Sequence, residues 1–315
     1  MKFFCDEMTP RVRVMIGMDC DRPRGEFIAT KEGSDMAERK INSIEKISSQ
    51  LHKLDLPRTF SICGSFLESM SLKFGKERMN NAFSVKDDNV EIADHSYSHN
   101  IVKPIKNRPD KIPLTPNQVI EEYHKNTKIF KELLGLDIPN RGYRTPLGHY
   151  EGLSNLDLLQ DELLKSGILY VSSDLRGPND SLYAPLVNAN NVARQPYTYE
   201  NGLLEIPSMG WQDVVFSQPD YISKFEKLPE DLPNNIDGIR DYTYNMISNA
   251  NSIVLNKNRD FFFGLCLHPY DTSFYDIEQK FFVYLKDIVN EFEGSFCTYK
   301  KVSEYYNQEG SKLLA

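Results

Sequence analysis

Runs of almost continuous apolar residues alternate with segments of helical periodicity along nearly all of this 315-residue chain. A strand that is apolar on both faces is buried on both faces, which is typical of a parallel sheet covered by helices. Eight such strands are expected, at residues 11–19, 59–63, 90–94, 141–144, 168–174, 203–206, 261–267 and 295–299. The alternation therefore predicts an α/β fold with a parallel sheet, either doubly wound or closed into a barrel.

Several segments between these strands carry helix signals. Residues 34–54 place isoleucines and leucines at spacings of three and four, which predicts one buried stripe. Thr115-Pro116-Asn117-Gln118 has the pattern of a capping box with proline at the first helical position, and Gly135 is the expected stop. Ser154 is expected to cap the next helix, and residues 275–292 to form the last long one. Stretches rich in Pro and Asn near 180–200 and 217–240 are expected to be insertions in a single domain that spans residues 1–315.

The charge balance and the cysteines narrow the choice of function. With 37 basic and 45 acidic side chains, the net charge is 37 − 45 = −8, which argues against nucleic acid as a partner. No run approaches the roughly 20 apolar residues of a bilayer span, which excludes an integral membrane protein. The amino terminus lacks the pattern of a secretory signal, and the five cysteines include no Cys-x-x-Cys pair. A cytoplasmic location is therefore expected, and a homo-oligomer is left open.

Two pairs of residues that can bind metals follow expected strands. His95 and His99 are spaced i, i+4, which would put both imidazoles on one face of a helical turn, near enough to share an ion. Asp19 and Asp21 end the first strand, and two carboxylates on the same side of an extended chain repel each other unless a cation or an arginine lies beside them. Taken alone, each pair is better explained by a polar loop or a solvated turn than by a site.

The placement of these residues along the chain is more informative than either pair. Chemically capable side chains stand at or just beyond the carboxyl ends of several expected strands. In parallel α/β folds this edge is where active sites are assembled from several strands at once. We therefore expect an enzyme active site here, made from Asp19, Asp21, His95, Arg144, Asp174 and His268.

These segments resemble the motifs of the polysaccharide deacetylases, over roughly residues 12–300. The fourth motif of that family has two candidates here, Ser173-Asp174-Leu175-Arg176-Gly177 and Gly210-Trp211-Gln212-Asp213. The other similar segments are Met18-Asp19-Cys20-Asp21, an Asp-x-Asp variant of the first motif; His95 to His99, the second; Arg144-Thr145-Pro146-Leu147-Gly148, the third; and Leu267-His268, the fifth. The resemblance implies a distorted or incomplete (β/α) barrel with a metal-dependent site that hydrolyses amides.

The resemblance also implies a role for each residue. One divalent ion, with Zn²⁺ first and Fe²⁺, Mn²⁺, Co²⁺ or Ni²⁺ as alternatives, would be held by Asp21, His95 and His99. Asp19 would accept the proton of the attacking water, and Arg144 would keep Asp19 ionised. His268, oriented by either Asp174 or Asp213, would protonate the leaving nitrogen. A backbone N–H near Leu147 would stabilise the oxyanion.

The expected substrate is a small molecule or glycan, namely an N-acylated sugar that loses an acetyl or formyl group. Arg24 and Arg176 lie on segments that leave the strand ends, where they would bind an anionic group such as a phosphate, although both could equally pair with nearby acids. Trp211 is a further candidate for substrate binding. The alternatives are hydrolysis of a cyclic imide or ureide, as in allantoinases, and a non-catalytic carbohydrate-binding relative. A 2-His-1-carboxylate oxygenase would use the same three ligands, but the α/β alternation argues against it.

Overall fold

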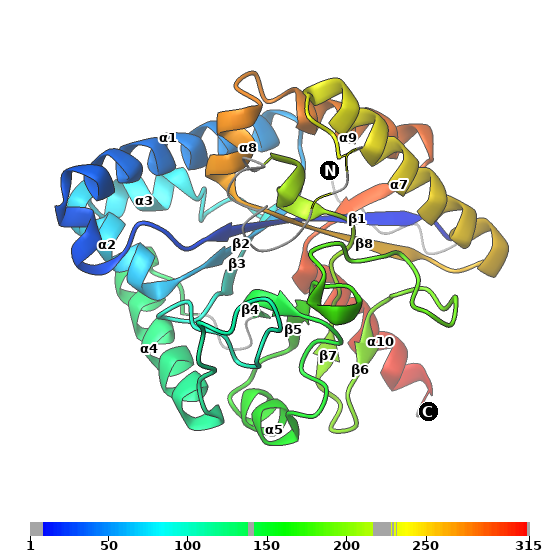
Figure 1. Ribbon diagram of the computed structural model, residues 1–315, viewed down its shortest axis with the longest axis horizontal. Helices are drawn as coiled ribbons and strands as arrows, with labels where there is room; N and C mark the ends of the chain where they lie inside the picture. Colours follow the sequence, from blue (N-terminus) through cyan, green and yellow to red (C-terminus); the bar gives the residue numbers. More distant parts are fainter. Residues whose placement is uncertain (1–8, 138–141, 217–227, 229, 231, 314–315) are drawn as a thin grey trace.

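Nine strands form one curled sheet in the computed structural model, which describes residues 9–137, 142–216, 228, 230 and 232–313 (Figure 1). The strand order is β6-β7-β5-β4-β3-β2-β1-β8, and β9 lies beside the amino-terminal half of β1. The pairs among these strands are parallel, apart from the antiparallel pair of β6 and β7. The strands are β1 (Val12–Cys20), β2 (Arg58–Ile62), β3 (Val90–Asp94), β4 (Gly142–His149), β5 (Tyr170–Asp174), β6 (Tyr197–Thr198), β7 (Leu204–Glu205), β8 (Phe261–Leu267) and β9 (Ser295–Cys297).

Over the described residues, the sheet curls into a barrel that no strand ladder closes. Between β7 and β8 the described residues make single contacts instead: Met209 N–H donates to the Gly264 carbonyl at 3.0 Å. Nearby, the Gln195 side chain accepts from Phe262 N–H at 2.7 Å and donates to the Phe262 carbonyl at 3.4 Å. The predicted distorted or incomplete (β/α) barrel is therefore confirmed.

Helices surround the curled sheet, and Figure 1 shows α1, α4, α5 and α9 on successive sides of it. The buried stripe of α1 is formed by Ile41, Ile44, Ile47 and Leu51, as its spacing predicts. The helical elements are η1 (Gly25–Ala29), α1 (Lys31–Lys53), α2 (Gly64–Phe74), α3 (Lys76–Ala82), α4 (Pro116–Leu134), α5 (Asp157–Lys165), η2 (Pro178–Asp180), η3 (Gln212–Phe216), α7 (Ile236–Lys257), α8 (Pro269–Tyr275), α9 (Lys280–Glu291) and α10 (Tyr299–Leu313). In the described part of the chain, none of these is both long and apolar enough to cross a bilayer.

Local helix signals were right in one case and wrong in two. Thr115 and Gln118 form the predicted capping box of α4, and Gly135 ends that helix in the left-handed conformation at φ 68°. Ser154 does not cap α5, because Asn155 is left-handed and the helix begins only at Asp157. The predicted helix 275–292 is interrupted, because the Asp276 carboxylate accepts the Phe281 N–H at 2.7 Å and so marks the start of a separate helix, α9.

The two expected insertions differ from each other. The stretch 180–200 is mostly irregular, with an isolated bridge between Val187 and Ala193 and the short strand β6 near its end. Of the stretch 217–240, residues 217–227, 229 and 231 lie outside the described residues. Its last part belongs to α7, which begins at Ile236 after an Asn235 cap.

Candidate active site

Asp19 lies at the carboxyl end of β1 and is almost completely buried. Its Oδ1 atom is 3.5 Å from Arg144 Nε, and its Oδ2 atom is 3.8 Å from His95 Nε2. The Cys266 thiol, from β8, donates to the same Oδ2 atom at 3.2 Å. Burial raises the pKa of Asp19, but the charges of Arg144 and His268 and the hydrogen bond from Cys266 outweigh it, so the pKa lies below its ordinary value. Asp19 is therefore an ionised carboxylate near neutral pH.

His95 and His99 meet, but not on a helical turn. Residues 95–99 form a loop after β3 in which Ser96 and His99 have positive φ values, so the i, i+4 helical geometry expected from the sequence is wrong. Short local bonds shape this loop: Ser96 N–H donates to Asp94 Oδ1 at 2.8 Å, and His99 N–H to Ser96 Oγ at 2.9 Å. Two left-handed residues bring the imidazoles together all the same, with ring centroids 4.9 Å apart.

The chemistry of Asp21, His95 and His99 fits a divalent cation. The Nδ1 atom of His95 is 2.9 Å from the Arg144 carbonyl, which leaves Nε2 as the nitrogen that faces the site. Burial lowers the pKa of both histidines, that of His99 to about 3, so both are neutral and able to ligate a metal. Burial raises the pKa of Asp21, but His99 and His268 outweigh it, and Asp21 is ionised. Asp21 Oδ2 lies 3.4 Å from His99 Nε2.

A second group of acids and histidine lies beside this trio. In the described chain, Asp213, His268 and Asp271 are the residues that bring three ligand-type atoms within 4.8 Å of one another, a closer set than the predicted trio. Burial lowers the pKa of His268, but Asp213, Asp21 and Asp271 more than compensate and raise it to about 10. A protonated imidazole has no lone pair for a metal. This group is therefore an ion-pair cluster around a charged histidine.

The two aspartates considered for the fourth motif have different partners. Asp213, in η3, accepts from His268 Nδ1–H at 2.8 Å. Asp174, at the end of β5, forms a 2.7 Å ion pair with Arg194 and accepts the Glu151 N–H at 3.2 Å. The structure thus brings Asp213 to His268 and ties Asp174 to the 180–200 stretch.

Arg144 contacts residues that lie outside the motifs found in the sequence. Its guanidinium lies over the Tyr299 ring, 5.0 Å from the centroid, and donates to Ser208 Oγ at 3.2 Å. Gly17 leaves room for it, because a Cβ atom there would lie 2.6 Å from Arg144 Nη2. Ser208 and Tyr299 are 64 and 155 positions from Arg144 in the chain, and Cys266 sits inside an apolar run, so the sequence carries no local signal for any of them.

The remaining predicted residues lie around this centre. Leu147 has a φ of 62°, and Arg176 donates to the Leu147 and Gly148 carbonyls at 2.9 and 3.2 Å, which holds this bend of β4 in place. Arg176 also donates to the Asp180 carbonyl at 2.7 Å. Arg24 donates to the Asp21 carbonyl at 2.7 Å, and a quarter of its side chain is exposed. The Trp211 ring lies 5.2 Å from that of Tyr183.

Residues 39–161 match the model of the polysaccharide deacetylase family, which confirms the resemblance. This chain has the polysaccharide deacetylase fold. It is similar to a Mycobacterium smegmatis protein assigned to these deacetylases, at 15% identity and a TM-score of 0.56, with 96% of this chain and 93% of that one covered. It is also similar to a Pseudomonas aeruginosa PAO1 protein described as a probable polysaccharide deacetylase, at 13% identity and a TM-score of 0.58, with 95% of this chain and 92% of that one covered. The likeness to the Puue allantoinase has 12% identity and a TM-score of 0.58, with 96% of this chain and 92% of that one covered. No curated protein sequence matches this chain.

Proposed function

We propose that this protein is a metal-dependent hydrolase that removes an acetyl or formyl group from the nitrogen of an acylated sugar. The observation that carries the proposal is that a deprotonated carboxylate and a protonated imidazole lie at the same edge of the sheet. Asp19 is an ionised carboxylate, and His268 is a protonated imidazole. Hydrolysis of an amide needs both a base and an acid, because water must lose a proton and the nitrogen must gain one.

Asp19 is the base in this proposal. It accepts the proton of the attacking water, and the nearby Arg144 and Cys266 thiol hold its carboxylate in one orientation. A divalent cation bound by Asp21, His95 and His99 would polarise the water and the acyl carbonyl. His95 is oriented for this by the Arg144 carbonyl, so one residue of β4 supports both the base and a ligand.

His268 is the acid. Its Nδ1–H is held by Asp213, which leaves Nε2–H to protonate the departing nitrogen. The Leu147 segment would supply a backbone N–H to the oxyanion, in a bend held by the Arg176 guanidinium. Arg24 stands next to Asp21 and would bind an acidic group on the substrate, such as a phosphate.

A second candidate is the opening of a cyclic imide or ureide. It is favoured by the fold likeness to an allantoinase, which is as close by TM-score as the likeness to either deacetylase. The same base and acid would serve, since ring opening also needs attack by water and protonation of a nitrogen.

One experiment separates these candidates. The protein is loaded with Zn²⁺, Mn²⁺ or Co²⁺ and offered N-acetyl sugars, N-formyl sugars and cyclic imides, with released acid or ring opening as the readout. We expect turnover of N-acyl sugars that falls by about 10²–10⁴-fold in Asp19→Asn and is unchanged in Asp88→Asn, an exposed acid just before the amino end of β3. Turnover of imides alone would favour the second candidate. Turnover of no amide by any metal form would refute both.

A further inference from the structure

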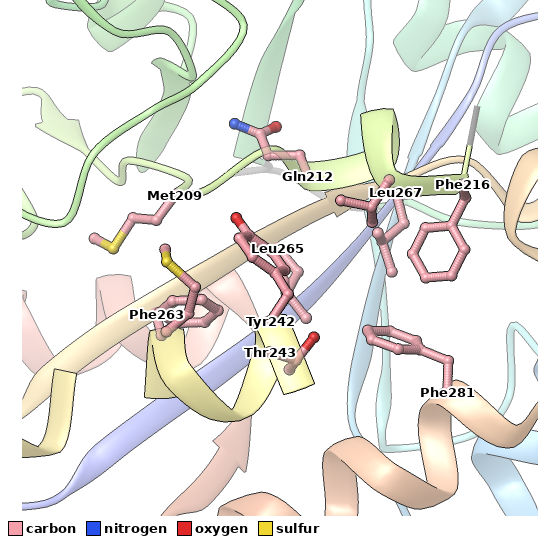
Figure 2. Close-up of a pocket in the computed structure, with 11 residues that line it drawn as sticks. Met209, Gln212, Phe216, Tyr242, Thr243, Phe263, Leu265, Leu267 and Phe281 are labelled. Atoms are coloured by element: carbon pink, nitrogen blue, oxygen red, sulfur yellow. The ribbon is translucent and has the colours of Figure 1, made fainter. Parts of the chain in front are cut away.

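Asp213 reaches His268 from η3, a short helical turn that lies over a cavity (Figure 2). The cavity has a volume of about 20 Å³, room for about one water molecule, and is lined by residues of η3, α7, β8 and α9 and by Met209. Figure 2 shows Gln212 of η3 on one side of it, with Tyr242 of α7 and Leu265 of β8 opposite. Phe216, at the carboxyl end of η3, packs its ring against that of Phe281 with the centroids 5.0 Å apart, whereas atoms that face the void gain no van der Waals contact there.

Directional hydrogen bonds hold the amino-terminal end of the segment. Trp211 N–H donates to the Tyr242 hydroxyl at 2.8 Å. The Trp211 carbonyl in turn accepts the Val214 N–H at 3.0 Å, which closes the turn that contains Asp213. Gln212 adds a tether from its side-chain amide to the Leu175 carbonyl at 2.8 Å. The backbone N–H of Trp211 is therefore bound to Tyr242, and the carbonyl of the same residue begins the turn.

The Tyr242 hydroxyl is seated closely against this backbone. A Cβ atom added to Gly210 would lie 2.5 Å from that hydroxyl, so only glycine allows the approach. Gly210 is itself anchored to Ala184 by a pair of backbone hydrogen bonds at 2.6 and 3.1 Å. The Tyr242 side chain, on α7, packs against the buried hydrophobic core, which restricts the position of its hydroxyl.

We propose that Tyr242 is a positioning residue for the Asp213–His268 pair. Its hydroxyl fixes the Trp211 peptide, and through that peptide it fixes the turn that presents Asp213 to the imidazole. The inference rests on the proposed function, in which His268 protonates the leaving nitrogen. Tyr242 itself does not touch the reacting atoms.

The test compares Tyr242→Phe with Tyr244→Phe. Tyr244 lies two positions away on the same helix, is partly exposed, and donates to Glu291 at 3.0 Å, so it is a matched control. The first readout is the pKa of His268, followed by NMR of histidine-labelled protein. The groups that act on this imidazole are Asp213, Asp271, Asp21, Asp19 and His99. We expect the pKa to fall by about half a unit or more in Tyr242→Phe and to stay unchanged in Tyr244→Phe.

The second readout is turnover of an N-acetyl amide and of an activated acetate ester. Amide kcat should fall about tenfold in Tyr242→Phe with KM little changed, whereas the ester, whose leaving group needs no proton, should lose less than about threefold. Gln212→Met removes the second tether and should move the His268 pKa in the same direction.

The outcomes separate the two ideas. Equal loss on amide and ester with an unmoved His268 pKa would show that Tyr242 is only structural and would overturn the inference. An unmoved pKa with unchanged amide turnover would also overturn it. A lowered pKa in a protein that hydrolyses no amide would support the positioning role of Tyr242 while refuting the proposed function.

Discussion

The Asp213–His268 pair should make the protein lose stability as the pH rises above neutrality. The ordinary histidine pKa is 6.5, and that of His268 is raised to about 10. The difference of about 3.5, at 1.36 kcal/mol per pKa unit, sets an upper bound of about 5 kcal/mol on the contribution to the unfolding free energy, because about a quarter of each side chain is exposed and water screens the pair. A raised pKa means that the folded state holds the proton more tightly than the unfolded chain does. The contribution is therefore complete below pH 6.5 and is lost as the pH rises toward 10.

Asp213→Asn removes the partner at 2.8 Å but leaves Asp21 and Asp271 in place, so part of the effect remains. The unfolding free energy of both proteins should decline between pH 6.5 and 10. We expect the decline in the variant to be about 2–3 kcal/mol smaller than that in the wild type. Urea unfolding of chelator-treated protein, followed by circular dichroism, measures both curves. Lysines, tyrosines and cysteines titrate alike in the two proteins and cancel in the comparison. Parallel curves would refute the assignment of a charged His268.

Three further predictions concern the metal, the substrate and the barrel interior. Asp21→Ala or His95→Ala should lose bound metal in elemental analysis, whereas Asp19→Asn should keep it; the reverse pattern would exchange the roles of the two aspartates. Arg24→Ala should raise KM about tenfold for a phosphate-bearing N-acyl sugar, with a smaller effect at high salt and none on a neutral analogue. Gly17→Ala should cost about 1–3 kcal/mol of stability in urea unfolding, because its Cβ would lie 2.7 Å from the Leu265 carbonyl as well as against Arg144; Gly238→Ala, with no contact closer than 3.5 Å, is the control.

The strands and their shared edge could be predicted because they depend on short-range patterns. The apolar run 261–267 coincides with β8, and residues 90–94 with β3, since a strand buried on both faces leaves a continuous signature. The capping box at Thr115 needs only four residues and was equally visible. The edge placement of Asp19, His95 and His268 then followed from parallel topology alone.

The contacts within the site could not be predicted, because they join segments far apart in the chain. Asp174 ends β5 and Asp213 lies in η3 after β7, and only the path of η3 brings Asp213 to His268. The helical spacing of His95 and His99 gave the right neighbours for the wrong reason, since the loop between them uses left-handed residues. Tyr299 reaches Arg144 through the barrel interior, where side-chain contacts depend on how the sheet curls.

Asp21 links the two halves of the site. Its charge acts on His99 and also raises the pKa of His268, so the acid and the predicted metal ligands share one carboxylate. An acid with a pKa near 10 is protonated at neutral pH but releases its proton reluctantly, and general acids work best when their pKa is near the working pH. A cation bound to Asp21 would offset part of the negative charge near His268. This would lower the pKa of His268 and make it a stronger acid. Asp21→Asn isolates this effect without any metal: we expect the His268 pKa, followed by NMR in chelator-treated protein, to fall, though by less than in Asp213→Asn, whose partner is in direct contact. An unchanged pKa in Asp21→Asn would show that the two halves are electrostatically independent.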